Sequence, residues 1–271
     1  MSTPVREPAV AGQFYPGRRD VLEREVRSFT SAASGEKIRA LGCVAPHAGY
    51  MYSGAVAGAL YGRLELPKRF IVLCPNHTGQ GEPLAINSRG SWRTPLGEAR
   101  IDSALADSLK TSFPLLAEDE DAHRGEHAVE VQIPFLQSLV RDLSFVPITV
   151  GVSQYEVLAA LGVTLAKVTA ECAEPVLVVA SSDMNHYESD EATRIKDSLA
   201  IERMLALDAK GLWETVQREH ISMCGYGPAV AMLTAAVRRG ASKAELVKYG
   251  TSGDVSHDSA WVVGYAAIAV W

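Results

Sequence analysis

The chain has 271 residues, 47% of them hydrophobic, and a formal net charge of −6. This length suits one large α/β domain or two small ones and allows a substantial buried core. The net negative charge argues against a general binder of nucleic acid or anionic membranes, because phosphate contacts need clustered Lys and Arg. Residues 1–10 lack the apolar stretch of a signal peptide, and residues 261–271 are too few to span a bilayer. We therefore expect a reduced, cytoplasmic protein.

Short apolar runs alternate with longer helical patterns along the chain. Runs that predict strands lie at residues 38–46, 69–76, 143–151, 175–183, 245–252 and 261–270. Patterns that predict helices lie at residues 21–33, 53–64, 101–113, 156–171, 191–219 and 227–240. Segments 34–37 and 87–98 are predicted to be loops, and no linker divides the chain. The alternation predicts a single layered α/β domain over residues 1–271, with a central, largely parallel or mixed sheet flanked by helices.

Two histidines follow predicted strands at the point where each strand ends. His47 stands in "APHAGY" after the strand ending at Ala45, and His77 stands in "PNHTG" after the strand ending at Leu73. Active sites in open α/β sheets form beyond the carboxyl ends of strands. A single histidine of this kind is explained by backbone hydrogen bonds in a turn. The repeated arrangement, with proline before and glycine after each ring, favours metal ligation by both.

A third strand end carries the sequence "SSDMNH", with Asp183 and His186. Three interpretations of His186 are open: it is a third metal ligand, a general base, or a residue at a helix start without a chemical role. Asp183 lies three residues earlier. It is predicted to orient the His186 ring, to cap the following helix, or to do both.

Cys224, in "MCGYGP", precedes the helix predicted near residue 229. The helix dipole and free backbone N–H groups favour a thiolate at such a position, so we predict that Cys224 is reactive or a ligand. Cys43 and Cys74 lie inside apolar strand runs and are predicted to be core residues, and Cys172 is predicted to be inert. The chain has no CxxC pair that would suggest a disulfide framework.

The remaining polar clusters give weaker signals. His127 and Glu130 are one helical turn apart and are predicted to face the same cleft. Residues 118–121 are predicted to form a solvated acidic loop. The other three histidines are predicted to be surface residues: His123, His220 and His257. GxGxxG, Walker A, HExxH and GxSxG motifs are absent, and no serine context favours a hydrolase triad.

Seven blocks of the sequence resemble the Memo family, in order and spacing, over nearly the whole chain. They are "APHAGYMYSG", "CPNHTG", "RTPLGEARID", "GEHAVEVQIPFL", "VVASSDMNHY", "MCGYGP" and "WVVGYAAIAV". Bacterial and archaeal members of this family are often called AmmeMemoRadiSam system protein B. The family is similar in fold to the LigB-type class III extradiol dioxygenases, which are non-haem Fe(II) enzymes that open catechol rings. The resemblance implies a single α/β domain with its site at one edge of the sheet.

The resemblance also implies roles for individual residues. His47 and His77 match two metal-ligand histidines shared with the dioxygenases. Cys224 matches the Memo cysteine at the third ligand position, where the dioxygenases use glutamate. His186 matches their acid/base histidine, and His127 matches a further active-site histidine. Asp183 lies in the same block as a supporting group.

These roles predict a metal-dependent redox protein, with Fe(II) as the first choice of metal. Zinc and copper are the alternatives, because a thiolate is softer than a carboxylate. The expected substrate is a small molecule, aromatic by analogy with the dioxygenases, or a peptide. The family name implies a pathway shared with radical-SAM and AMMECR-type proteins.

Two other functions stay open, and the sequence alone leaves turnover undecided. One is a protein that binds metal, a peptide or a partner without turnover, as eukaryotic Memo proteins are associated with signalling and phosphotyrosine peptides. The other is a zinc hydrolase, in which His186 or Glu126 would activate a metal-bound water.

Overall fold

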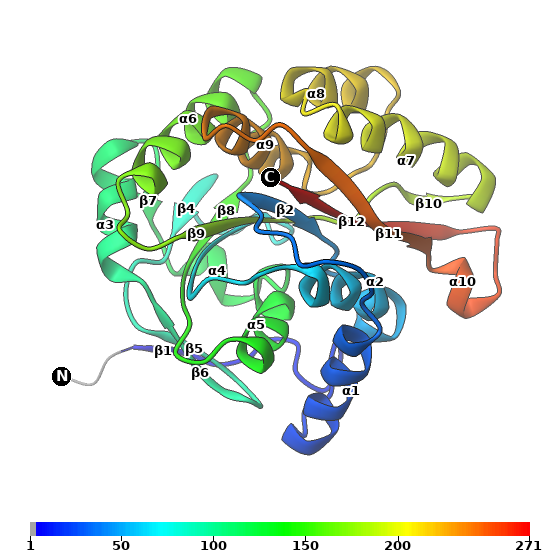
Figure 1. The fold of residues 1–271 in the computed structure, drawn as a ribbon, viewed down its shortest axis with the longest axis horizontal. Helices are drawn as coiled ribbons and strands as arrows, with labels where there is room; N and C mark the ends of the chain where they lie inside the picture. Colours follow the sequence, from blue (N-terminus) through cyan, green and yellow to red (C-terminus); the bar gives the residue numbers. More distant parts are fainter. Residues whose placement is uncertain (1–3) are drawn as a thin grey trace.

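Residues 4–271 are described by the structure, a computed structural model, and twelve strands among them join in one mixed sheet (Figure 1). In spatial order the main path is β1 (Val5–Arg6), β5 (Ser91–Thr94), β6 (Gly97–Ile101), β8 (Ser144–Val150), β3 (Arg69–Pro75), β9 (Val176–Ser181), β2 (Gly42–Ala45), β12 (Val262–Val270) and β10 (His186–Glu188). Off this path, β11 (Ala244–Thr251) pairs with β12, β4 (Leu84–Ile86) with β8, and β7 (Ala117–Glu118) with β4.

Strands β6, β8, β3, β9 and β2 run parallel, whereas β12 pairs antiparallel with β2, β10 and β11. The predicted fold class is therefore confirmed, and the six predicted strands correspond to β2, β3, β8, β9, β11 and β12. The prediction of a loop at 87–98 is wrong, because this segment contains β5 and the start of β6, which form an antiparallel hairpin. Four paired residues in each strand are too few to show a clear period in sequence.

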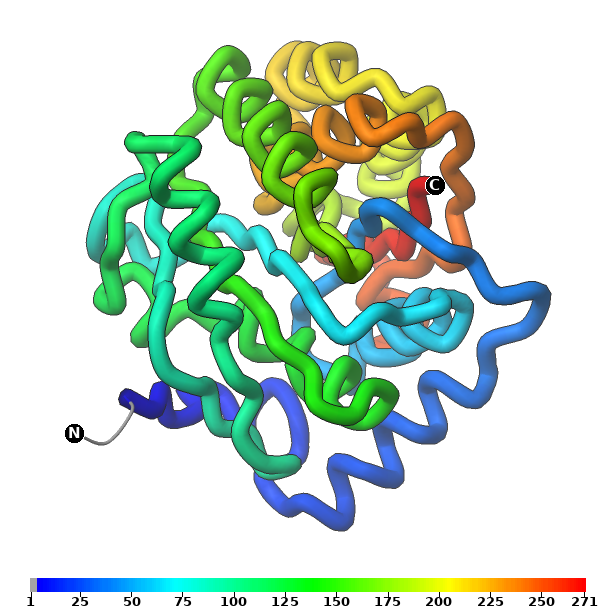
Figure 2. Tube along the Cα trace, turned by 60° about the vertical axis from the view of Figure 1, so that its left-hand side comes forward, coloured from blue at the N-terminus to red at the C-terminus, as the bar shows by residue number. Residues whose placement is uncertain are grey.

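Helices cover both faces of the sheet. One face packs against α3 (Ser103–Ser112), α6 (Tyr155–Ala170), α7 (Asp190–Leu205), α8 (Ala209–Arg218) and α9 (Tyr226–Arg238). The other packs against α1 (Arg19–Ser31), α2 (Tyr50–Arg63) and α5 (Ile133–Leu139). Figure 2 shows α6 and α9 at the top of the molecule and α1 at the bottom. Short helices α4 (Asp121–Arg124), η1 (Glu130–Gln132) and α10 (Gly253–Ser256) lie in connections.

Alternating side chains along the central strands supply the two cores. In β3, Ile71 and Leu73 belong to the cluster under α6 and α9, whereas Phe70 and Val72 belong to the cluster under α1 and α2. This is the period of two expected when both faces of a strand are buried. None of the helices that residues 4–271 form is long and apolar enough to cross a bilayer.

The helical pattern at 191–219 is two helices rather than one. Leu207 adopts a φ of 57°, in the left-handed region, which ends α7. The side chain of Asp208 then accepts a hydrogen bond from Gly211 N and caps α8. The break lets α7 reach β10 and β12 while α8 packs against α9.

Candidate metal centre

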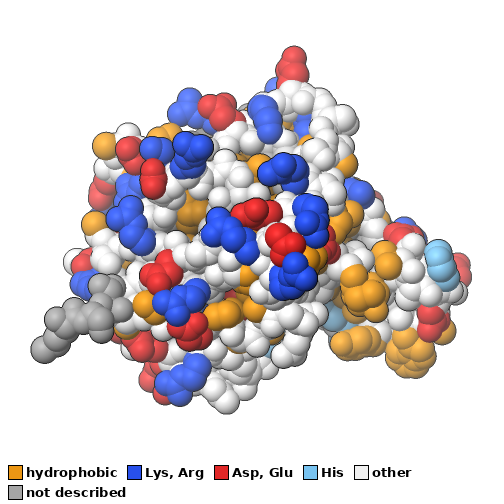
Figure 3. Space-filling view, turned by 90° about the horizontal axis from the view of Figure 1, so that it is seen from below, with side chains coloured by type: hydrophobic (Ala, Val, Ile, Leu, Met, Phe, Trp, Pro, Cys, Tyr) orange, Lys and Arg blue, Asp and Glu red, His pale blue; other side chains and the backbone are white. Residues whose placement is uncertain are grey.

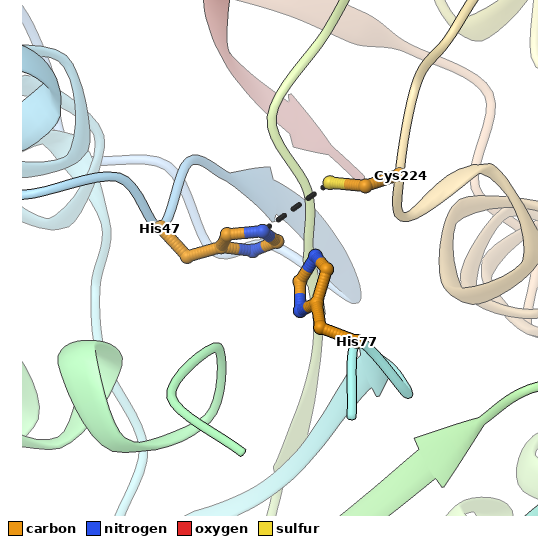
Figure 4. A group of neighbouring side chains, drawn as sticks. All are labelled: His47, His77 and Cys224. Carbon is orange, nitrogen blue, oxygen red and sulfur yellow. Dashed lines mark hydrogen bonds between the residues drawn. The ribbon is translucent and has the colours of Figure 1, made fainter. Parts of the chain in front are cut away.

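Parallel strands β3, β9 and β2 are neighbours, so their carboxyl ends meet at one edge of the sheet, where His77, Asp183 and His47 follow them. Cys224 reaches the same place from the connection between α8 and α9, with its Sγ 3.2 Å from His47 Nε2 (Figure 4). One ligand atom each from His47, His77 and Cys224 lie within 4.8 Å of one another. Bonds to one zinc-like ion place neighbouring ligand atoms about 3–4 Å apart. The three side chains therefore have the geometry to hold one metal ion.

The ring of His47 is fixed by a buried serine. Its Nδ1 lies 3.0 Å from Ser181 Oγ, and this hydroxyl donates its only proton to the carbonyl of Ala128 at 2.7 Å. Nδ1–H must therefore be the donor to Ser181, which leaves the lone pair on Nε2 facing Cys224. Burial, followed by the neighbouring imidazoles, lowers the pKa of His47 well below its usual value, so the ring is neutral at pH 7.

A buried carboxylate fixes His77. Glu126 Oε1 accepts a hydrogen bond from His77 Nδ1 at 2.9 Å and Oε2 accepts one from His77 N at 2.7 Å. Burial acts to raise the pKa of Glu126, but hydrogen bonds and charge from His77, with a bond from Ala128 N, outweigh it and the pKa is lowered. The ionised carboxylate orients the ring with Nε2 free, as second-layer carboxylates do for metal-binding histidines.

Glu126 is not placed to act as a base. It is fully buried, and both of its oxygens already accept hydrogen bonds. The part of the hydrolase hypothesis that gives Glu126 the role of activating water is therefore wrong. A second group with metal-like spacing, His77, Glu126 and His127, shares these same carboxylate oxygens and is explained by the orienting contact.

The six site residues predicted from the sequence all line one pocket of about 500 Å³. They are His47, His77, His127, Asp183, His186 and Cys224. The His127 ring stacks on His77, with centroids 4.8 Å apart and 22° between the planes, and lies 5.4 Å from the His47 ring. Burial lowers the pKa of both His127 and His186. The rings of His47, His127 and His186 are therefore neutral at pH 7.

Asp183 has neither of the two roles predicted from its spacing, which were to orient the His186 ring and to cap the following helix. Its Oδ1 accepts hydrogen bonds from the backbone N–H groups of His47 at 2.7 Å and Ala48 at 3.3 Å, so it shapes the turn that carries His47. The cap of α7 is Ser189, because strand β10 lies between Asp183 and the helix. His186 accordingly begins a strand rather than a helix. Burial raises the pKa of Asp183 to about 7, against the effect of its backbone hydrogen bonds.

Cys224 lies where predicted, but its predicted thiolate preference is wrong for the metal-free chain. Burial, and then the charge of Asp183, raise the pKa of the thiol. The N–H of Gly225, at the start of α9, donates to Ser182 Oγ at 2.9 Å. Hydrogen bonds from this region act to lower the pKa of the thiol, but burial outweighs them. A bound cation would deprotonate the thiol directly. Cys43 and Cys74 are fully buried core residues, as predicted.

Glu130 does not share the cleft with His127. It is fully buried and accepts hydrogen bonds from Ala9 N, Val10 N and the Tyr15 hydroxyl at 2.6–3.0 Å. It also pairs with Arg6 at 2.6 Å. These contacts hold the N-terminal segment that brings Phe14 into the pocket wall, 4.7 Å from the His127 ring.

The surface prediction for His123 is also wrong. Its side chain is 1% exposed and packs edge-on to Trp92, while Arg6 Nε donates to its carbonyl at 2.8 Å. The N-terminal segment thus covers it, which no local pattern indicates. In the predicted acidic loop, Glu118 ends β7, Asp121 begins α4, and the two residues between them form the connection. Glu118, Glu120 and Asp121 are exposed, as predicted. His220 and His257 are exposed, as predicted.

Comparison with known proteins identifies the family. The family described as Memo-like protein matches residues 6–269. The chain belongs to the Memo family. A MEMO1 family protein of Methanosarcina mazei is 44% identical over 98% of this chain and 99% of its own length. Another, from Archaeoglobus fulgidus, is 42% identical over 97% of this chain and 98% of its own length. The predicted resemblance to the Memo family is confirmed.

The fold also occurs outside these relatives. The crystal structure of uncharacterized protein JW3007 from Escherichia coli K12 superposes with a TM-score of 0.55 and 17% identity. The match covers 83% of this chain and 99% of that one. At this identity the likeness shows a shared α/β fold and carries nothing about activity.

Proposed function

We propose that this Memo-family protein binds one Fe(II) ion through His47, His77 and Cys224 and uses it to oxidise a small substrate. The observation that carries the proposal is the convergence of two free Nε2 atoms and one sulfur within 4.8 Å at the sheet edge. Two neutral imidazoles and one thiolate would leave positions on the ion open to other ligands. Bound iron would supply the redox chemistry at this place.

His186 is the group we propose to move protons. Its Nδ1 lies 2.9 Å from the carbonyl oxygen of Ser222, which can only accept, so Nδ1 carries the proton. Nε2 therefore keeps its lone pair, and the lowered pKa keeps the ring neutral at pH 7. A neutral imidazole with one open nitrogen suits removal of a proton from a substrate hydroxyl and its later return.

The remaining pocket wall favours an aromatic substrate. Phe14, Tyr187, Val263 and Tyr265 line the pocket beside the imidazoles. Exposed apolar side chains continue beyond it on β10, α10 and the residue before β12, namely Tyr187, Val255 and Trp261. Figure 3 shows hydrophobic side chains gathered on the projecting right-hand end of the molecule, and in Figure 1 α10 occupies that end. Ring-shaped substrates pack well against such walls.

The decisive test is anaerobic Fe(II) titration of the wild-type protein and a His47→Ala, His77→Ala double variant. We expect one equivalent of iron in the wild type and none in the double variant. A His220→Ala, His257→Ala double variant is the matched control, because both rings are exposed and lie outside the pocket. Equal iron binding by the site variant and the wild type would overturn the proposal.

Two further measurements separate the alternatives. Oxygen uptake by the iron-loaded protein with a panel of catechols tests oxidation, and bound iron without any uptake would favour the role in binding metal or a partner. Metal analysis of protein isolated without oxygen or chelators identifies the resident ion. Zinc there would favour metal-assisted hydrolysis over redox chemistry.

A further inference from the structure

His186 makes two hydrogen bonds to Ser222, in the connection between α8 and α9. The backbone N–H of His186 donates to Ser222 Oγ at 2.7 Å, and its ring Nδ1 donates to the Ser222 carbonyl at 2.9 Å. The two contacts define both the position of the histidine backbone and the rotation of its ring. Nε2 is therefore left without a proton, on a residue that lines the pocket.

Ser222 is in turn held by Asn185. The fully buried Asn185 accepts hydrogen bonds at Oδ1 from Ser222 N at 3.1 Å and from Ser222 Oγ at 3.0 Å. Its Nδ2 donates to Glu188 Oε2 at 2.7 Å. Ser222 lies two residues before Cys224. The side chain of Asn185 therefore fixes the position of the α8–α9 connection, which carries Cys224, relative to β10, which carries His186.

The deepest member is Asp197 on α7. It is fully buried, and it accepts hydrogen bonds from Asn185 N at 2.8 Å and from the Tyr249 hydroxyl at 2.7 Å. Strand β12 approaches closely enough to complete this arrangement because residue 264 is glycine. A Cβ there would lie 1.8 Å from Asp197 Oδ2, and Gly264 N donates to the Asn185 carbonyl at 2.9 Å.

We propose that Asn185, Ser222 and Asp197 form a positioning clamp that holds His186 as the Nδ1–H tautomer and keeps Nε2 available to a substrate. The clamp consists of positioning residues, since Asn185 and Asp197 act on the pocket only through Ser222 and His186. Its value for catalysis rests on the proposed function of His186. Its effect on the ring is a property of the metal-free chain and is tested there.

The first measurement is the tautomer of His186 in wild-type, metal-free protein labelled with ¹⁵N at histidine. Two-bond ¹H–¹⁵N correlation spectra distinguish the nitrogen that bears the proton, and the His186→Gln variant assigns the signal. We expect a single Nδ1–H form at pH 7.5. An Nε2–H form, or comparable populations of both, would overturn the proposal without any variant.

The second measurement compares two serine variants. Ser222→Ala removes the hydroxyl that links His186 N to Asn185, and we expect the population of the minor tautomer to rise about fivefold, the factor typical of one lost hydrogen bond. Ser198→Ala is the matched control, because the Ser198 hydroxyl donates only to Ile195 O on α7 and lies outside the clamp. An unchanged tautomer in Ser222→Ala, or an equal change in Ser198→Ala, contradicts the clamp.

The two proposals fail in different ways. A wild-type protein that binds no metal but shows one His186 tautomer would end the proposed function and leave the clamp intact. A wild-type protein that binds iron but shows mixed His186 tautomers would end the clamp and leave the proposed iron site intact.

Discussion

The two walls of the pocket are anchored by different chemistry. On the wall of His77 and His127, the supports are the buried carboxylates Glu126 and Glu130, which make charge-assisted hydrogen bonds. On the wall of His186, the ring donates to the carbonyl of Ser222 and the backbone N–H donates to its hydroxyl. Charge-assisted bonds are roughly twice as strong as neutral ones. A carboxylate also makes the opposite ring nitrogen a better donor to metal. The difference fits the proposed function, in which His77 binds the metal ion and His186 takes up a proton and returns it.

The largest effect is expected from breaking the carboxylate wall at Glu130. In Glu130→Ala, the Arg6 guanidinium stays buried without its partner, so we expect the free energy of unfolding to fall by about 3–5 kcal/mol. Urea unfolding at pH 7 measures the change. The control is Glu98→Gln, which breaks an exposed pair with Arg93 and should leave the unfolding midpoint unchanged. A loss at Glu130 no larger than at Glu98 would mean that the N-terminal segment is held by other contacts.

A second test addresses the charge that underlies the other wall. Burial raises the pKa of Asp197 to about 6, although Tyr249 and Asn185 act to lower it. The folded state therefore binds this proton more tightly than the unfolded state. The contribution of protonated Asp197 to the free energy of unfolding is full below about pH 4 and is lost as the pH rises through about 6. Asp197→Asn lacks this titration.

We therefore expect the stability of Asp197→Asn, relative to the wild type, to increase by roughly 3 kcal/mol between pH 4 and pH 7, at 1.36 kcal/mol for each unit of pKa shift. Urea unfolding at four pH values in this range measures it. The control is Glu214→Gln, an exposed carboxylate on α8. If the wild type and Asp197→Asn keep a constant difference, Asp197 is ionised throughout this range and burial does not raise its pKa.

What the sequence could predict depended on how local the signal is. Long apolar runs identified the six strands that carry the core, and strand ends identified His47 and His77. The supports of these residues were hidden because their partners are distant in sequence. Arg6 and Glu130 are 124 residues apart, and Ser181 and His47 are 134 apart.

The same reason explains why the prediction for Asp183 is wrong and why the sequence gives no signal at Asn185. Asp183 is three residues from His186, which suggested a contact with that ring, but its partners are two backbone N–H groups after β2. Asn185 directly precedes His186, but no local pattern indicates its role, because that role depends on Ser222, 37 residues further on. Residue type and spacing identify the side chains of a site. The hydrogen bonds that orient them follow only from the packing of strands and loops.

A third, intermediate effect is expected at Glu126. Glu126→Gln keeps an acceptor oxygen for the His77 ring but removes the negative charge, so we expect metal affinity to fall about 10–100-fold. Titration of Zn(II) against a competing chelator measures this without redox complications. Glu120→Gln, an exposed carboxylate on the same connection, is the control and should bind as the wild type does. Unchanged metal affinity in Glu126→Gln would mean that the negative charge of Glu126 does not contribute to metal binding by His77.

The smallest effect concerns backbone strain on the His186 wall. Tyr187 has a φ of 59°, in the left-handed region, and is 67% exposed. Tyrosine is disfavoured in this conformation, whereas asparagine is several-fold enriched there. We expect Tyr187→Asn to raise the free energy of unfolding by about 0.5–1 kcal/mol, because relief of strain exceeds the small loss of packing.

Trp261→Asn separates strain from the general effect of removing an exposed aromatic side chain. Trp261 is 70% exposed and is not among the non-glycine residues with positive φ. Its replacement should therefore give no gain. If only Tyr187→Asn raises the free energy of unfolding, the strained conformation of Tyr187 lowers the stability of the wild type. The chain would then keep a destabilising tyrosine next to His186, where it lines the pocket. Equal gains in the free energy of unfolding at both positions would mean that the loss of exposed apolar surface causes the effect. The left-handed conformation of Tyr187 would then not destabilise the protein.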